Sequence, residues 1–276
     1  MPWIYMILAA TAFVVVEMTL THAVARHLQN NSIVDVVWSA GFAFLGVTYL
    51  ITAPQLSGGS SLNTSRALLL LMILIWSGRL AAHLFVRVKR HHPKEDIRYA
   101  QLRQEWGASV DRRMFGFFQL QGAIQVVLSL PWLLVFGDVS ANRSIQTLSW
   151  FEIAGASLWL VGLFGETLAD RQLAHFRKDP ANVGKVCQVG LWNYSRHPNY
   201  FFEWLIWVAF FLFACGSPWG WISLIAPALM WHFLVHVTGI PMTEELSVRS
   251  KGDAYRAYQK STSAFIPWFK RSHPKP

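Results

Sequence analysis

Long apolar stretches, separated by short polar connections, dominate the chain as far as residue 237. A helix needs about 20 mostly apolar residues to cross the hydrocarbon region of a bilayer. The pattern therefore predicts an all-α polytopic membrane protein with seven transmembrane helices. We expect them at residues 3–21, 33–53, 67–86, 115–136, 150–169, 200–215 and 219–237.

Composition agrees with this pattern. Hydrophobic residues make up 53% of the chain and charged residues only 14%, against about 25% charged residues in a soluble domain. Two cysteines, Cys187 and Cys215, provide neither a disulfide framework nor a metal cluster, so we expect no metal site. No internal repeat or separate soluble segment is visible, and we predict a single transmembrane domain over residues 1–276.

Positive charge is concentrated on one side of the predicted bundle. With seven crossings, 21 of the 24 Lys and Arg residues fall in connections on one face, and the exceptions are Arg66, Arg79 and Arg143. The positive-inside rule makes this face cytoplasmic, with the N-terminus outside and the C-terminus inside. Topology and attraction to anionic membrane lipids account for more than half of these charges. Nucleic-acid binding is disfavoured, because no recognition module is present.

Ionisable residues also occur inside the predicted spans, where they are costly and usually face a cavity or a partner. We expect a shared polar pocket that opens to the cytoplasm, although Glu17 has an equally plausible place at a helix end. These residues are Glu17, Asp35, Arg79, His83, Glu166, Asp170, Glu203, His232 and His236.

Helical spacing places several of these groups together. Arg79 and His83 share a face, as do Asp35 and Trp38. A salt bridge from Arg79 to Asp35 or Glu17 is the structural alternative to a functional role. Trp38 and Trp76 suit the walls of a flat apolar ligand, but tryptophan in membrane proteins also serves as an interfacial anchor.

The segment from Asp170 to Tyr200 is the densest polar stretch beside the membrane. Its Arg and Lys side chains suit phosphates, its Asp and Asn side chains suit ribose hydroxyls, and its Trp and Tyr rings suit stacking on a base. Pro198 opens a helix whose free N–H groups favour an anion. A structured cytoplasmic loop with ordinary helix caps is an equal alternative on composition alone.

The same segment carries a recognisable pattern. It comprises Asp170-x-Gln172-Leu173-x-x-Phe176-Arg177, Asn182-x-Gly184-Lys185, Gly190-Leu191-Trp192-x-Tyr194-Ser195-Arg196-His197-Pro198-Asn199-Tyr200-x-x-Glu203-Trp204, Thr243-Glu244-Glu245 and Tyr255-x-x-Tyr258-Gln259. This pattern resembles the bacterial branch of the steroid 5α-reductase-like membrane proteins, known as a domain of unknown function, DUF1295. A weaker match includes Asp35-x-x-Trp38, Arg79 and Glu95-Asp96-x-Arg98-Tyr99.

The resemblance implies seven helices around a cytoplasm-facing NADPH site, with a lipid-like enone or other activated alkene entering from the bilayer. It implies substrate-side helices in residues 1–136 and a cofactor-binding half in residues 145–270. A Rossmann site is excluded, because no Gly-x-Gly-x-x-Gly follows a strand. The cofactor-binding candidates are Arg79, His83, Glu166, Asp170, Arg177, Asn182, Lys185, Tyr194, Arg196, His197, Asn199, Tyr200, Glu203, His236, Glu244 and Tyr255.

Our catalytic candidates are Asp35, Trp38 and Trp76. Steroid 5α-reductases polarise the substrate ketone with a Gln-Glu pair and a Tyr, whereas this chain has Asp35 near the first place and Trp76 near the second. If burial keeps Asp35 protonated, it can stabilise an enolate. We therefore expect a membrane-bound oxidoreductase of lipid metabolism, in a bacterial inner membrane, with its site facing the cytoplasm; a monomer suffices.

Two other functions remain open. Arg196-His197-Pro198-x-Tyr200 and Glu244-Glu245 also resemble the isoprenylcysteine carboxyl methyltransferases, which bind S-adenosylmethionine. The basic residues of the Asp170–Lys185 segment favour the reductase, because S-adenosylmethionine has no phosphate. A lipid-binding or transport protein is a third class, but neither an inverted repeat nor broken midplane helices are visible.

Overall fold

The computed structural model describes residues 2–54, 62–139 and 147–270. Within these ranges the regular structure is helical, and the one β-contact is an isolated bridge between Ser195 and Ser263. The all-α prediction is confirmed for the described part of the chain. Arg143, one of the basic residues off the predicted cytoplasmic face, lies outside it.

The chain divides into two compact units. The first comprises Met1–Glu152 and Ala214–Ser223, and the second comprises Ile153–Phe213 and Leu224–Pro276. The boundary at Glu152 lies close to the expected division between residues 1–136 and 145–270. The short segment Ala214–Ser223 belongs to the first unit although it lies late in the sequence.

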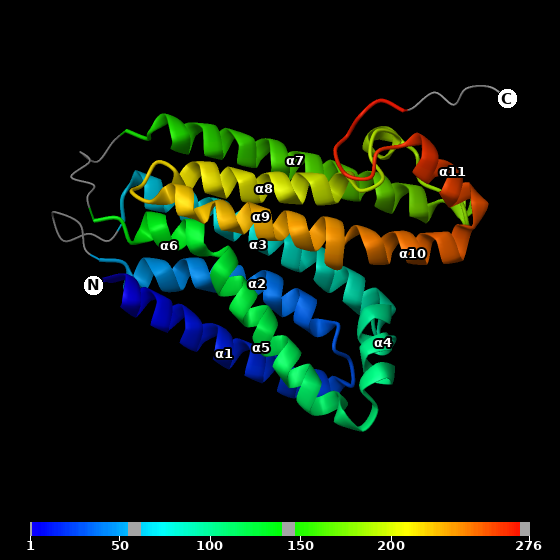
Figure 1. Ribbon diagram of the computed structural model, residues 1–276, viewed down its shortest axis with the longest axis horizontal. Helices are drawn as coiled ribbons and strands as arrows, with labels where there is room; N and C mark the ends of the chain where they lie inside the picture. Colours follow the sequence, from blue (N-terminus) through cyan, green and yellow to red (C-terminus); the bar gives the residue numbers. More distant parts are fainter. Residues whose placement is uncertain (1, 55–61, 140–146, 271–276) are drawn as a thin grey trace. The chain divides into compact units, whose positions relative to one another are not determined.

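The first unit is built on six helices, in which α2 packs along both α1 and α3, and α1 also packs along α5 (Figure 1). Its α3 is capped at the N-terminus by Asn63, whose side chain accepts a hydrogen bond from the Arg66 amide, and ends in a basic turn that complements the helix dipole. The helices are α1 (Pro2–Leu28), α2 (Ile33–Thr52), α3 (Thr64–His91), α4 (Ile97–Trp106), α5 (Val110–Leu128) and α6 (Leu130–Phe136), with a 3₁₀ turn at Gly107–Ser109.

A break at Ser129 separates α5 from α6, and the two helices meet at an angle of 47°. Pro131 causes the break, because proline has no N–H to continue the helical ladder. The Ser129 hydroxyl donates to the Val126 carbonyl at 2.8 Å and lies 2.7 Å from the Tyr49 hydroxyl of α2. The break is therefore held by buried hydrogen bonds.

The second unit is organised around the close approach of α7 and α8, which run side by side in Figure 1. A Cβ on Gly155 would lie 2.6 Å from the Phe213 nitrogen, and one on Gly162 would lie 3.1 Å from the Phe202 carbonyl oxygen. Small residues allow such contact between membrane helices. Its elements are α7 (Trp150–Lys178), α8 (Pro198–Ala214), α9 (Ile225–His232), α10 (Ile240–Lys251) and α11 (Asp253–Ser261), with a π-helical turn at Phe233–Val237 and 3₁₀ turns at Pro180–Asn182 and Gly190–Asn193. A further 3₁₀ turn, Gly220–Leu224, belongs almost entirely to the first unit.

Five described helices are long and apolar enough to span a membrane, and six qualify if α5 and α6 form one bent span. The five are Trp3–Leu28, Ile33–Thr52, Thr64–His91, Trp150–Lys178 and Gly220–Lys251. Helix α8 is also apolar but has only 17 residues. These helices suit an integral membrane protein, whereas seven crossings and the orientation of the termini remain predictions.

Candidate functional site

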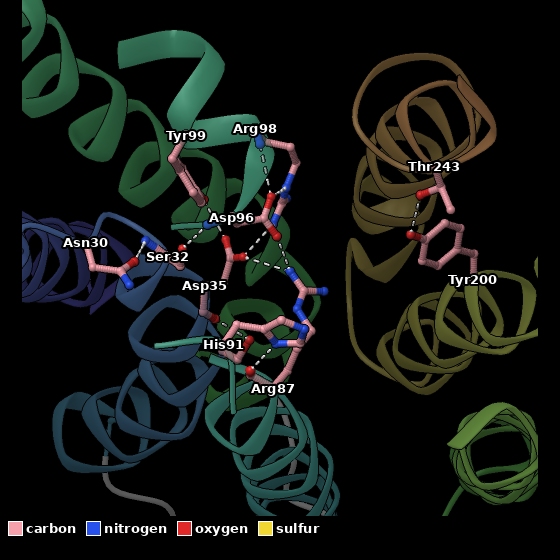
Figure 2. A network of polar contacts seen from close by, with 11 residues as sticks. Asn30, Ser32, Asp35, Arg87, His91, Asp96, Arg98, Tyr99, Tyr200 and Thr243 are labelled. Carbon is pink, nitrogen blue, oxygen red and sulfur yellow. Dashed lines mark hydrogen bonds and ion pairs between the residues drawn. The ribbon is translucent and has the colours of Figure 1, made fainter. Parts of the chain in front are cut away.

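Asp35 lies at the centre of a polar network in the first unit (Figure 2). It stands in the first turn of α2, where a carboxylate is favoured by the helix dipole. Arg98 Nη2 donates to its Oδ2 at 2.5 Å, and the Tyr99 hydroxyl donates to its Oδ1 at 2.5 Å. Arg87 Nη2 lies 3.7 Å from the same Oδ2. Asp35 is thus an acceptor of charge-assisted hydrogen bonds.

Asp96 balances the second positive charge of this network. Its Oδ2 accepts from Arg87 Nη2 at 2.6 Å and its Oδ1 from Arg98 Nε at 2.9 Å. Burial raises the pKa of Asp96, but the hydrogen bond and charge of Arg98 outweigh burial, so that its pKa lies below the usual value. The Asp96 amide also donates to the Ser32 hydroxyl at 2.7 Å. Two carboxylates and two guanidinium groups therefore tie the start of α4 to α2 and α3.

Glu95 adds a further connection between the segment before α4 and the loop that leads into α2. Its Oε1 accepts from the Asn31 amide at 2.7 Å and from Arg103 Nη2 at 3.1 Å. The arginine partners of Asp35 are Arg98 and Arg87. The expected alternative, a salt bridge from Arg79 to Asp35 or Glu17, stays a prediction.

Trp38 and Trp76, predicted to wall a ligand, belong to an aromatic cluster of the first unit. The Phe42 ring lies 4.7 Å from Trp38 and 5.3 Å from Trp76, and Trp132 lies 6.3 Å from Trp76. Trp76 is fully buried. Trp38 is half-buried, and its Nε1 donates to the Gln121 carbonyl at 3.1 Å. Trp76 is thus a core residue, and contact of either ring with a ligand remains a prediction.

Arg79 and His83, one turn apart on α3, also belong to the first unit. Arg79 is half-buried and His83 is exposed. The other predicted cofactor-binding residues belong to the second unit.

In the second unit, Arg196 is enclosed by acceptors. Its Nε donates to Glu244 Oε1 at 2.6 Å, and its Nη1 donates to the carbonyls of Gln259 and Thr262 at 2.9 and 2.5 Å. Gln259 Nε2 donates to Glu244 Oε2 at 2.7 Å. Through its Nε and Nη1 donors, Arg196 joins the start of α8 to α10 and α11, and its contact with a phosphate remains a prediction.

His197 lies beneath Tyr200 in the same network. Their rings are stacked with centroids 5.3 Å apart and planes inclined by 6°. Burial lowers the pKa of His197 below its ordinary value, although the neighbouring Glu244 opposes this shift. The Tyr200 hydroxyl lies 3.1 Å from the Thr243 hydroxyl of α10 (Figure 2). The stacked pair thus packs beside the Arg196–Glu244 ion pair, with His197 Nε2 3.3 Å from Glu244 Oε1.

Tyr258, on α11, also belongs to the Arg196 network. Its hydroxyl donates to the carbonyl of Ser195 at 3.1 Å and makes a short hydrogen bond to the carbonyl of Trp192. Burial raises the pKa of Tyr258 well above its usual value, so it stays a donor. Tyr255, a predicted cofactor residue, is also buried, and burial raises its pKa to about 12.

Asp170 and Asn199 form a pair between α7 and the first turn of α8. Asn199 Nδ2 donates to Asp170 Oδ1 at 3.4 Å. The Asn199 Oδ1 atom is buried and has no hydrogen-bond partner among the described residues. An unsatisfied buried acceptor is costly, so this oxygen is suited to a ligand hydroxyl.

A cavity of about 150 Å³ lies beside the C-terminal turns of α7. Three cationic side chains, Arg177, Lys185 and Lys251, line it, and a tight turn with Gly184 at φ +76° shapes its edge. Burial raises the pKa of the adjacent Cys187 thiol despite the nearby Arg177 and Lys251, so the thiol stays neutral. The remaining lining residues are Leu173, Phe176, Asn182 and Val183.

The other predicted cofactor residues of this unit have diverse environments. Glu166 and Glu203 are buried, and Glu203 Oε1 accepts from Trp207 Nε1 at 3.0 Å. His236 is exposed and lies in the π-helical turn, 4.8 Å from the Trp231 ring. Tyr194 is 41% exposed, and its carbonyl accepts from the Trp268 amide. Within the described ranges, neither His236 nor Tyr194 is among the residues that line the cavity.

Sequence reasoning missed several residues that complete these networks. Lys251 lines the cavity from the end of α10, far from the Arg177–Lys185 segment in sequence. Arg87, Asp96 and Tyr99 surround Asp35. The Glu95–Tyr99 stretch is only a weak match to the family pattern, and no helical spacing rule relates it to α2.

The fold and these polar networks define a class, the polytopic all-α membrane proteins with ionisable groups clustered at helix ends. Within that class, the chain belongs to the DUF1295 family, described as proteins of unknown function, whose model matches residues 21–262. A relative is the uncharacterized protein C594.04c of Schizosaccharomyces pombe, 26% identical over 283 residues, covering 89% of this chain and 75% of the relative. No solved structure matches the chain.

Proposed function

We propose that the protein is an NADPH-dependent membrane reductase that reduces a conjugated C=C bond of a lipid-like substrate. The observation that carries this proposal is the tricationic cavity formed by Arg177, Lys185 and Lys251. Its volume of about 150 Å³ is smaller than a site for a whole small-molecule ligand, which takes roughly 300–1,000 Å³. The cavity therefore suits one phosphate-bearing part of a dinucleotide.

The donor set fits this role. Guanidinium and ammonium groups bind phosphate through charge-assisted hydrogen bonds. The buried, unsatisfied Oδ1 of Asn199 and the neighbouring Asp170 suit the hydroxyls of a ribose. These two features lie in the same unit and in the segment that carries the family resemblance.

Bound NADPH would supply the hydride, and the protein side chains would position the cofactor and balance the charge of its phosphates. Arg177, Lys185 and Lys251 would hold the phosphates, and Asp170 with Asn199 would orient the ribose. We propose that the site faces the cytoplasm, since α3 and α7 both end in basic turns. The membrane that we expect is a bacterial inner membrane.

The catalytic role of Asp35 stays a prediction, but its contacts bear on the form of that role. Both carboxylate oxygens of Asp35 act as acceptors, from Arg98 and Tyr99. Donation of a proton by Asp35 would require the loss of these contacts. In the structure Asp35 positions α4, and its effect on an enolate would be indirect.

Direct titration of the purified protein in detergent tests the proposal. We expect NADPH to bind and Lys251→Gln or Lys185→Gln to weaken binding about tenfold each, since hydrogen bonds to charged groups contribute about 1.5–3 kcal/mol. The matched control is Lys260→Gln, which removes an exposed cation of the same unit. Failure of the wild-type protein to bind NADPH would refute the proposal. If NADPH binds but no lipid enone causes its oxidation, the proposal would be restricted to nucleotide binding.

A methyltransferase is the second candidate, because the Arg196–Glu244 ion pair joins the two motifs that resemble isoprenylcysteine carboxyl methyltransferases. S-adenosylmethionine carries no phosphate, so the cavity cations would then have no ligand. Titration with S-adenosylmethionine is therefore the discriminating arm. Binding of S-adenosylmethionine that is unaffected by Lys251→Gln, without NADPH binding, would favour the methyltransferase.

A further inference from the structure

The segment that follows α11 in the second unit carries exposed aromatic side chains. Trp268 is 68% exposed and Phe269 is 73% exposed, and their ring centroids lie 6.2 Å apart. The exposed Tyr194 ring lies edge-on to the Phe269 ring, with centroids 6.1 Å apart. We call Tyr194, Trp268 and Phe269 the aromatic patch. Exposed apolar side chains that gather in one place, unlike single ones, mark a surface that binds a protein or a membrane.

Hydrogen bonds hold the aromatic patch against the loop that leads into α8. The Trp268 amide donates to the Tyr194 carbonyl at 2.9 Å, and the Arg196 amide donates to the Ser263 carbonyl at 2.8 Å. In Figure 1 the red segment beyond α11 accordingly lies beside the start of α8. The three aromatic rings are thus presented in a preformed arrangement, which reduces the entropy that binding to a partner costs.

This loop lies at the level where α7, a candidate membrane span, changes from apolar to polar. Helix α7 is mostly apolar before Asp170 and mostly polar after it. Asn199, in the first turn of the apolar α8, donates to Asp170 at 3.4 Å. Trp192, two residues before Tyr194, donates from Nε1 to the Ala169 carbonyl at 2.9 Å. The aromatic patch is therefore attached at the polar end of two apolar helices, which is where a membrane–water interface lies.

The charge around the aromatic patch indicates which partner it fits. Residues 185–197 and 262–276 contain no Asp or Glu. Lys270 is exposed, and its Nζ donates to Gln188 Oε1 at 2.8 Å, which leaves two of its three donors for a ligand. Trp and Tyr are enriched at membrane–water interfaces, and Lys is attracted to anionic lipids. A two-fold contact between copies of the chain would place the same cations opposite one another, which is costly.

We propose that the aromatic patch inserts into the headgroup region of an anionic bilayer, with Lys270 against a lipid phosphate. The patch then anchors the loop that leads into α8 to the membrane surface. Because Arg196 and Asn199 follow Tyr194 closely in the sequence, this anchor also fixes the depth of these two residues. Membrane contact of the patch does not depend on a nucleotide. It can therefore fail while NADPH binds, and it can hold while NADPH does not bind.

A fluorophore attached to the aromatic patch tests this contact. Full-length Phe269→Cys is labelled with an environment-sensitive nitrobenzoxadiazole group in nanodiscs of phosphatidylglycerol and phosphatidylcholine. We expect blue-shifted emission that a nitroxide near the top of the lipid acyl chain quenches more strongly than one at the chain end. The matched control is Val183→Cys, which is 81% exposed in the turn after the polar end of α7 and should emit as in water. The labelled wild-type protein corrects for reaction at Cys187 and Cys215.

The roles of Trp268 and Lys270 are tested with the same label. Trp268→Ser should lower the quenching at position 269, because the two rings enter the bilayer together. Quenching should also fall in phosphatidylcholine alone, and Lys270→Gln should reduce this dependence on the anionic lipid. Equal quenching in both lipids would refute the phosphate contact. Emission at position 269 that matches position 183 would place the patch in water and overturn the proposal. Blue-shifted emission without quenching by either lipid nitroxide would also overturn it, since protein would then cover the patch.

Discussion

The Tyr99 hydroxyl donates a hydrogen bond of 2.5 Å to Oδ1 of Asp35, joining two residues 64 positions apart in the sequence. Tyr99 is buried in a small apolar core with Met18 and Phe118. The bond therefore attaches the polar network to the packed interior of the first unit. It explains how a short helix such as α4, which has only 10 residues, is held against α2.

Tyr99→Phe should destabilise the protein by about 1–3 kcal/mol, because it leaves a half-buried carboxylate with one donor fewer. Thermal unfolding in detergent measures the effect. Tyr5→Phe is the matched control, since Tyr5 is 71% exposed and should show no change. Equal midpoints for Tyr99→Phe and the wild-type protein would show that Arg98 alone holds Asp35.

The Arg196–Glu244 pair gives a sharper comparison, because Glu244 has an exposed neighbour with the same chemistry. Glu244→Gln should cost about 3–5 kcal/mol, since it leaves Arg196 without its counter-charge at a site where that side chain is 10% exposed. Glu245→Gln should cost less than about 1 kcal/mol, because its pair with Arg249 lies at the surface. Thermal midpoints of the two variants, measured side by side, decide the point. Similar losses would contradict the assignment of Arg196 to a buried structural pair.

Much of the fold could be predicted from hydrophobic periodicity. Apolar stretches at 3–21, 33–53 and 150–169 correspond to α1, α2 and α7, and the helical class follows from them. The count of seven crossings could not be fixed in this way. Length alone does not distinguish a short helix such as α8 from a full span, and the 47° bend between α5 and α6 depends on one proline and one serine.

The candidate site could likewise be predicted only in part from the sequence. Local spacing places Arg177 and Lys185 together, and they do line one cavity. Lys251 joins them only through the path of the chain from α9 to α10, which no spacing rule describes. The position of Asp35 within an apolar helix allows either a protonated acid or a salt-bridge partner. Its arginine partners come from α3 and α4, and such partners are visible only in three dimensions.

Burial of His197 predicts a dependence of stability on pH. Its pKa is lower in the folded protein than the value of about 6.5 in an unfolded chain. As the pH falls below about 6.5, the unfolded state therefore takes up a proton at this histidine before the folded state does. The contribution of neutral His197 to the free energy of unfolding is thus complete above about pH 6.5 and is lost as the pH falls toward the pKa of the folded state. Chemical unfolding between neutral pH and mildly acidic pH should show the loss, and His197→Gln should reduce the slope.

The matched control for this titration is His27→Gln, because His27 is exposed at the end of α1. That variant should keep the slope of the wild-type protein. A slope that is unchanged in His197→Gln would assign the pH dependence to other groups. The measurement should stay above the range in which carboxylates titrate, since protonation of Glu244 would break its pair with Arg196.

Substitutions at Gly190 and Gly107 distinguish two effects of adding a side chain to a glycine, namely backbone strain and a clash of the new Cβ with a neighbouring residue. Both have positive φ, at +55° and +46°, so alanine at either position strains the backbone. At Gly107 a Cβ would meet nothing within 4 Å, whereas at Gly190 it would lie 2.2 Å from Gln172 Nε2. Gln172 Oε1 accepts from the Leu191 amide at 2.9 Å, and moving this side chain would break that bond. Gly190→Ala should therefore lower the thermal midpoint clearly more than Gly107→Ala, because it adds the loss of a hydrogen bond to the strain. Equal losses would show that Gln172 moves aside without cost, and that the turn leading to Arg196 does not depend on it.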